Sequence, residues 1–212
     1  MLVQGEHLGQ WVTENWGQTP KEKISVFPSA IDTDYFPMRK NPEKNNKIAV
    51  VSQVHWRKGT QLIPEILQAI PENYRIYQIG GIVNSDCWNY LTSELRRLKL
   101  IDRYLYEGTT DNVPKWLEDK AHFILPTYTE GLPRACGEAM SMGLRPMIHH
   151  YRGAEKQWPE EYIWCKPEEV AEMLKSKYEP EKYRNFIVEN RSLEVVAEMA
   201  EKLFEEGLNE ND

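Results

Sequence analysis

Residues 123–142 read FILPTYTEGLPRACGEAMSM, and this stretch decides the fold predicted for the chain. The apolar run Phe123 to Pro126 is typical of a buried strand, and the turn after it carries Glu130. Small and apolar residues from Ala135 to Met142 then follow a helical pattern that contains Glu138. The stretch therefore predicts a strand, a turn and a helix, with a carboxylate on each side of the helix start.

The predicted helix start suits a ligand with hydroxyl groups and negative charge. Pro133 fits the first helical position, where its missing N–H has no consequence. Helical side chains lean toward the N-terminus, so Glu138 can reach back toward the loop that carries Glu130. The free N–H groups of the first turn favour an anion. The alternative interpretation is that Glu130 is a solvated turn residue and Glu138 a surface residue.

Composition excludes several classes of protein. The chain has 212 residues, enough for one good-sized domain and marginal for two. A net charge of −7 argues against a nucleic-acid partner. No apolar run approaches the ~18 residues of a membrane span, although peripheral contact with a membrane stays open. The N-terminal residues lack the pattern of a signal peptide.

The cysteines indicate a reducing environment. Cys87, Cys136 and Cys165 are far apart and odd in number, so the sequence contains neither a disulfide framework nor zinc-ligand spacing. We therefore expect a cytoplasmic location. Many of the seven Trp and eleven Tyr residues fall in polar segments. They indicate either an interface with another domain or chain, or packing within one domain.

From Lys47 onward, short apolar runs alternate with helical patterns. The sequence predicts strands at 48–51, 75–79, 104–106, 122–125, 145–149 and 162–164, and helices at 62–70, 86–100, 113–120 and 135–142. This alternation predicts an α/β fold, a Rossmann-like parallel sheet with helices on both faces. Ligands of such sheets bind beyond the carboxyl ends of the strands. The loops 53–59, 80–81 and 128–133 all fall there.

Three regions make up the predicted organisation. Residues 1–38 hold a leading helix, 7–16, that ends at Gly17, then a short strand at 24–27 and a connector. Residues 39–178 form the Rossmann-like domain, with a helix at 168–178. Residues 179–212 form a helical tail, with helices at 180–190 and 192–207. The apolar face of the last helix is expected to pack on this domain or on a partner lobe.

With this order of elements, the chain resembles the C-terminal, donor-binding domain of a retaining GT-B glycosyltransferase of the family 4 type. The likeness covers roughly Ile24 to Trp164. It rests on five stretches in the family's order: the connector 24–36, the lysine–glycine loop 51–59, the glycine turn 76–81, the E-x7-E signature 130–143 and the strand with its glycine loop 145–155. The resemblance implies one lobe of a GT-B fold, a nucleotide-diphosphate sugar as donor substrate, and neither a metal nor another cofactor.

The resemblance also implies roles for individual residues. Glu138 would bind the ribose hydroxyls, and Glu130 would contact the transferred sugar. Lys58 would neutralise the leaving diphosphate, where a fixed cation lowers the barrier to glycosyl transfer. The remaining donor-site positions are the backbone of Gly131 and Leu132, the strand-end Gly80, and the base pocket beside Gly108 and Val113.

Two departures from the family pattern limit this interpretation. Gln53 stands where the family usually has an arginine that contacts the diphosphate. Arg57 or Arg134 could compensate; otherwise donor binding or catalysis is weakened. In addition, family members carry a second Rossmann-like lobe that binds most of the acceptor. Here the leading helix 7–16 corresponds to the end of that lobe. The chain is therefore either an excised domain or a half-enzyme that works with a separate N-terminal lobe or by self-association.

Three hypotheses follow from the sequence. The first is the donor-binding half of a glycosyltransferase that binds a nucleotide-sugar for retaining, metal-independent transfer. The second is a non-catalytic nucleotide-sugar-binding or scaffold module, which the Gln53 substitution and the missing lobe favour. The third is an enzyme similar to a nucleotide-sugar epimerase, which the E-x7-E signature disfavours.

Overall fold

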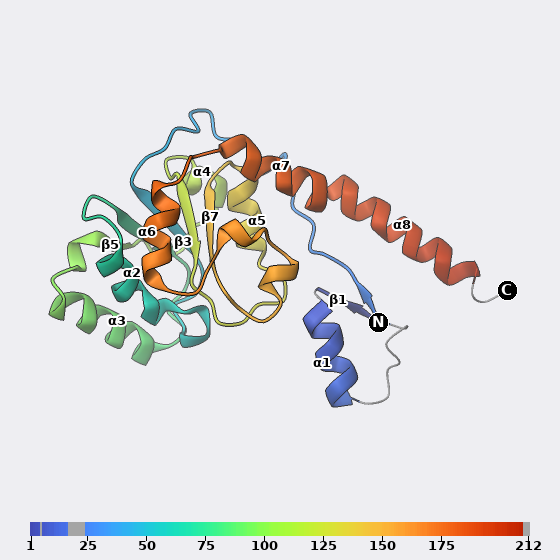
Figure 1. Cartoon of the computed structure of the whole chain (residues 1–212), viewed down its shortest axis with the longest axis horizontal. Coiled ribbons are helices and arrows are strands. Elements are labelled where there is room, and N and C mark those ends of the chain that lie inside the picture. The colour runs from blue at the N-terminus through green and yellow to red at the C-terminus, as the bar shows by residue number, and fades with distance from the viewer. Residues whose placement is uncertain (5, 17–23, 210–212) are drawn as a thin grey trace.

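The computed structural model describes residues 1–4, 6–16 and 24–209. Six parallel strands form its main sheet in the order β5-β4-β3-β6-β7-β8 (Figure 1). They are β3 (Lys47–Val51), β4 (Arg75–Ile79), β5 (Tyr104–Tyr106), β6 (His122–Leu125), β7 (Arg145–His149) and β8 (Ile163–Trp164). The chain runs outward from β3 to β5 and then returns to the other side of β3. The strand order therefore reverses between β3 and β6, where open α/β sheets bind ligands.

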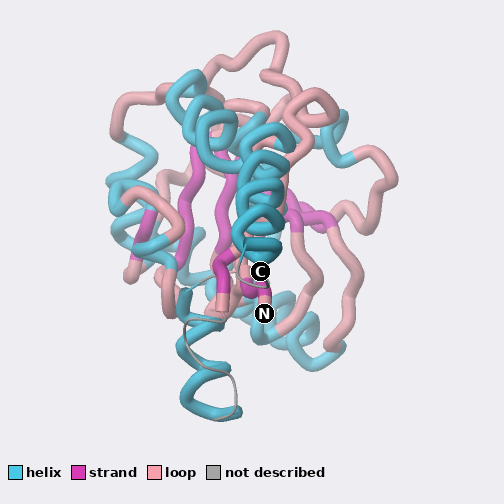
Figure 2. Tube along the Cα trace, turned by 90° about the vertical axis from the view of Figure 1, so that its right-hand side faces the viewer, coloured by secondary structure: helices cyan, strands magenta, loops and turns pink. Residues whose placement is uncertain are grey.

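Helices cover both faces of the sheet, as the alternation of strands and helices predicts (Figure 2). Ile48 and Val50 of β3 face a core shared with α2 (Ile63–Ala69), α3 (Ser85–Arg97) and α6 (Pro167–Lys175). Ala49, between them, faces the opposite core. The helices on that side are α4 (Val113–Leu117), α5 (Arg134–Ser141) and α7 (Pro180–Arg191). The predicted fold class is confirmed.

The N-terminal residues form a separate small unit. Strand β1 (Leu2–Val3) pairs in parallel with β2 (Ser25–Val26), and α1 (Glu6–Trp16) lies between them in sequence. The strand predicted at 24–27 is confirmed in a shorter form, whereas β1 was not predicted. Gly17, the predicted helix end, lies outside the described residues.

The last helix leaves the domain. Helix α8 (Leu193–Asn209) follows α7 after Ser192 and extends away from the sheet (Figure 1). Val196 is buried, but Leu193, Met199 and Phe204 on this helix are exposed. Among the residues described, only part of the apolar face of α8 therefore packs on the domain as expected.

Some local predictions were displaced. Pro133 precedes α5 as its N-cap residue and keeps an extended ψ of 108°, so the helix begins at Arg134. A 3-10 turn (Thr60–Leu62) comes before α2. Further 3-10 turns lie at Trp56–Lys58, Ile101–Arg103, Ala154–Lys156 and Glu160–Tyr162.

All three cysteines are free. None of the described helices has both the length and the apolar character needed to cross a membrane.

Candidate functional site

An ion pair joins the two loops at the point where the strand order reverses. Lys58, at the end of the 3-10 turn after β3, places its Nζ 2.5 Å from Oε1 of Glu130 in the loop after β6. Both side chains are mostly shielded, with exposed fractions of 22% and 13%. The two residues are 72 positions apart in sequence but meet in space because β3 and β6 are neighbours in the sheet. The two residues predicted as catalytic are thus in direct contact.

Backbone contacts hold these two loops together. The carbonyl of Arg57 accepts hydrogen bonds from the Thr127 hydroxyl at 3.1 Å and from the Tyr128 amide at 3.2 Å. Gly59 has a φ of +70°, and a Cβ there would lie 1.8 Å from the carbonyl oxygen of Pro126. Only glycine permits both that conformation and that approach. The Lys58–Glu130 geometry therefore rests on a rigid backbone junction.

Helix α1 also contacts the loop that carries Glu130. The ring nitrogen Nε2 of His7 lies 3.0 Å from the Glu130 carbonyl oxygen; since a carbonyl only accepts, His7 donates this bond. A Cβ on Gly131 would meet the Gln4 side chain at 2.9 Å. The Gly131 carbonyl accepts a hydrogen bond from Nε2 of Gln157 at 2.6 Å. No local pattern predicts these contacts, because His7 and Glu130 are 123 positions apart.

Glu138 lies on the first turns of α5, as predicted, and is half-buried. Burial raises the pKa of its carboxyl group, and the nearby Arg134 guanidinium opposes that rise. Arg134 Nη2 lies 3.4 Å from Glu138 Oε1, and the arginine side chain is 65% exposed. The carboxylate is thus a partly desolvated hydrogen-bond acceptor that can take donors from a ligand.

A second group of predicted residues lines a cavity of about 200 Å³ at the ends of β3 and β4. Gln53, Gly80 and Val113 belong to its wall, together with Ser52, Thr109 and Thr110. The Gly80 amide donates to the Gly108 carbonyl at 2.7 Å, so Gly108 fixes the wall from the loop after β5. The surface that faces the cavity is mostly apolar, and its size suits a small planar group.

The two arginines predicted to compensate for Gln53 differ in their surroundings. Arg57 and Gln53 are both exposed, and Arg134 contacts Glu138 on its own helix. Within the described part of the chain, neither arginine donates a hydrogen bond to Gln53. The expected compensation is a contact with the diphosphate of a donor, so it stays a prediction.

Two further observations complete the site. Among the described residues, no group of three or more His, Cys, Asp or Glu side chains is arranged to hold a metal ion. His149 places its Nδ1 3.0 Å from the Thr127 carbonyl oxygen and packs against the Trp164 ring. It therefore supports the loop after β6 from the neighbouring strand β7.

Comparisons with known proteins identify the family. Residues 45–177 match the family described as "Glycosyl transferases group 1". The chain belongs to the group 1 glycosyltransferases. The match includes Lys58, Glu130, Glu138 and the small cavity, but not α1. The resemblance inferred from the sequence is confirmed at the level of the family.

Two curated relatives of this group 1 glycosyltransferase chain carry the names of glycosyltransferases. One, from Escherichia coli, is UDP-Gal:alpha-D-GlcNAc-diphosphoundecaprenol alpha-1,3-galactosyltransferase, 28% identical over 149 residues. The other, from Homo sapiens, is a subunit of phosphatidylinositol N-acetylglucosaminyltransferase, 30% identical over 204 residues. The matches cover 62% and 87% of this chain, but only 38% and 41% of the relatives. The chain thus spans about two fifths of their length.

Solved structures show the same fold. A glycosyltransferase from Rickettsia africae superposes with a TM-score of 0.81 at 16% identity, covering 98% of this chain and 63% of that one. Anabaena HepE in complex with UDP and glucose superposes with a TM-score of 0.82 at 14% identity, covering 95% and 62%. At these identities the likeness establishes the fold, a GT-B lobe, and nothing about residues.

Proposed function

We propose that this chain is the donor-binding lobe of a glycosyltransferase and binds a nucleotide-diphosphate sugar. The observation that carries the proposal is the Lys58–Glu130 contact at the sheet's reversal point, inside the segment that matches the family. A cation, two carboxylates and a small cavity around one sheet edge supply what such a donor requires. HepE, a structural neighbour, was solved with UDP-glucose, which supports a uridine donor.

Each group has a role in the proposed donor complex. Glu138 accepts hydrogen bonds from the ribose hydroxyls, and the cavity beside Gly80 and Val113 takes the base. Lys58 exchanges part of its contact with Glu130 for the diphosphate and stabilises the charge that develops on the leaving group. Glu130 then faces the sugar and offsets positive charge at its anomeric carbon. Gly131 and Leu132 offer backbone N–H groups to the sugar and phosphate.

The finer reaction class belongs to the same proposal. We propose retaining transfer in which Lys58, rather than a metal ion, neutralises the diphosphate, in a cytoplasmic setting. The competing interpretation is a non-catalytic module, supported by the exposed Gln53 in place of a diphosphate-binding arginine. The epimerase-like alternative is favoured by no observation in the described part of the chain.

Complete activity is proposed to require a second lobe, and the small N-terminal unit supports this. Strands β1 and β2 form a parallel pair by themselves, with Leu2 60% and Val26 40% exposed. Parallel sheets are normally larger and covered on both faces. We propose that further strands, from a lobe that carries most of the acceptor site, complete this sheet. The longer chains of the structural neighbours are consistent with such a lobe.

The proposed donor function is tested by calorimetric titration with UDP, GDP, ADP and their sugars. The expected result is binding of one nucleotide class with a Kd between ~10 μM and ~1 mM, modest because this chain supplies only one wall of the proposed cleft. Absence of binding across the whole panel would contradict the proposal. If binding occurs but sugar is never transferred after an acceptor lobe is supplied, the non-catalytic alternative is favoured.

A further inference from the structure

A second cavity, of about 420 Å³, lies beside the donor site. It is bounded by the N-terminal unit, the segment after β7, and the junction of α7 with α8. Much of its wall is apolar, formed by side chains that include Val26, Leu132, Trp158, Phe186 and Met199. Arg191, the last residue of α7, lies in the same wall.

Arg191 is a buried cation with few partners. The residue is 5% exposed, and its guanidinium stacks on the Trp158 ring at 4.0 Å. Within the described part of the chain its guanidinium makes a single hydrogen bond, from Nη2 to the Gln157 carbonyl at 3.0 Å, and no ion pair. Burial lowers its pKa to about 10, so it stays charged at neutral pH. Buried charges normally have an ionic or hydrogen-bonded partner for most of their donors.

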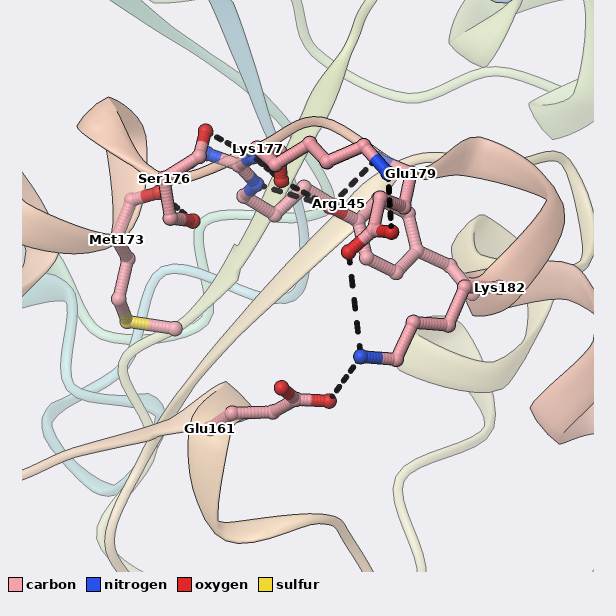
Figure 3. Close-up of polar contacts among 8 residues, drawn as sticks. Arg145, Glu161, Met173, Ser176, Lys177, Glu179 and Lys182 are labelled. Carbon is pink, nitrogen blue, oxygen red and sulfur yellow. Dashed lines mark hydrogen bonds and ion pairs between the residues drawn. The ribbon is translucent and has the colours of Figure 1, made fainter.

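Other shielded arginines of this protein satisfy that expectation. Arg145 donates to three backbone carbonyls at the end of α6 and to the Tyr183 hydroxyl (Figure 3). Arg103 donates to four backbone carbonyls. Each of these side chains makes four hydrogen bonds and ties neighbouring segments together. Arg191 differs from them, because among the described residues its guanidinium makes only one hydrogen bond.

We propose that this cavity binds the phosphate group of an amphiphilic ligand, with Arg191 as the cation that holds it and the apolar wall as the surface for its hydrocarbon part. A guanidinium matches phosphate oxygens with two parallel hydrogen bonds. Lys156 at the rim already pairs with Glu6, so Arg191 supplies the charge.

The cavity adjoins the proposed catalytic loop. Leu132 belongs to both, and Gln157, whose side chain holds the Gly131 carbonyl, lies beside Arg191. If the proposed function holds, on which this step rests, the ligand is the acceptor. The acceptor is then a phosphate-bearing lipid rather than a neutral sugar.

The test is calorimetric titration of the full chain with n-octyl phosphate, below its micelle concentration, alongside inorganic phosphate and n-octyl glucoside. Octyl phosphate is expected to bind at least tenfold more tightly than either control. Arg191→Met is expected to reduce its affinity at least tenfold, and Arg97→Met, an exposed arginine on α3, to leave it unchanged. Equal affinity for octyl phosphate and octyl glucoside, or equal affinity of wild type and Arg191→Met, would overturn the proposal.

A second pair of variants covers the case in which Arg191→Met does not fold. Met199 is 36% exposed on α8 and lines the cavity, so substitutions there should be tolerated. Met199→Glu supplies a carboxylate to Arg191 and is expected to abolish octyl phosphate binding, whereas Met199→Gln keeps it. Loss in both variants, or in neither, contradicts the assignment. UDP titrations separate the two proposals. If the protein binds UDP but not octyl phosphate, only the proposal for this cavity is refuted. If it binds octyl phosphate but not UDP, only the proposed donor function is refuted.

Discussion

Lys58 and Glu130 form a 2.5 Å ion pair that closes the junction between the loops after β3 and β6. The contact puts a cation next to the carboxylate expected to face a sugar, at the edge where parallel α/β sheets bind ligands. Because both side chains are mostly shielded, neither can lose its partner without consequence.

Removing Lys58 should weaken both stability and donor binding. Lys58→Met leaves the Glu130 carboxylate without its cation, at a cost of about 1–3 kcal/mol in the free energy of unfolding. It also removes the charge proposed to hold the diphosphate, so UDP affinity should fall about tenfold or more. Chemical denaturation and calorimetry measure the two effects. Lys115→Met, on the exposed surface of α4, is the matched control and should change neither.

Gly80 and its neighbour provide a test of the cavity wall. A Cβ on Gly80 would lie 2.1 Å from the Ser52 carbonyl oxygen, and its φ of +136° is unfavourable for other residues. Gly80→Ala should therefore lower the free energy of unfolding by about 2 kcal/mol or more. A Cβ on Gly81 would meet no atom within 4 Å. Gly81→Ala should be close to neutral in thermal and urea denaturation, and similar losses in both variants would refute this interpretation of the wall.

Glu138 should reduce stability at neutral pH. Its folded pKa is raised by burial, so the folded state holds a proton that the unfolded chain has released, and stability falls as pH rises above ~4.3 through the folded pKa. Glu138→Gln removes this penalty and should be at least as stable as the wild type at pH 7, with the difference vanishing below about pH 4. Urea denaturation across this range measures it. A variant clearly less stable at pH 7 would contradict the argument.

His122 should make the fold acid-sensitive. Burial, with help from the Arg145 charge, lowers its pKa from 6.5 to about 3. The unfolded chain takes up this proton below 6.5 and the folded chain does not, so the stabilisation is complete above 6.5 and is lost as pH falls toward 3. The slope is up to about 1.4 kcal/mol per pH unit. His122→Gln should flatten this dependence, measured by urea denaturation, while a substitution at the exposed His150 should preserve it.

The main sheet could be predicted because its signals are local. Strand β4, for example, was predicted at its observed bounds, since its apolar run is closed by the glycine turn at Gly80. Strand β1 was not, because two residues carry no periodic pattern. Helix α5 begins at Arg134, within one residue of the predicted range 135–142, but Pro133 is its cap rather than its first helical residue because it keeps an extended ψ. The proposed region boundaries at 38/39 and 178/179 stay predictions.

The candidate site was predictable in its residues and less so in its contacts. Lys58 and Glu130 were both chosen from their loops, and strand order brought them together. The contact of His7 with the Glu130 carbonyl depends on how the N-terminal unit docks, which no local pattern encodes. The unsaturated guanidinium of Arg191 likewise emerges only when its partners are counted in space. The individual roles of the donor-site residues stay predictions.

The most direct test is a comparison of UDP with 2′,3′-dideoxyuridine diphosphate in the wild type and in Glu138→Ala. If Glu138 holds the ribose hydroxyls, the wild type should bind UDP about tenfold more tightly than the dideoxy compound. A tenfold ratio corresponds to about 1.4 kcal/mol of hydrogen bonding. Glu138→Ala should bind both nucleotides with the same reduced affinity, because it lacks the carboxylate that accepts the hydrogen bonds of the ribose hydroxyls. A Glu138→Ala protein that still prefers UDP tenfold, or a wild type without any preference, would contradict the assignment of this site.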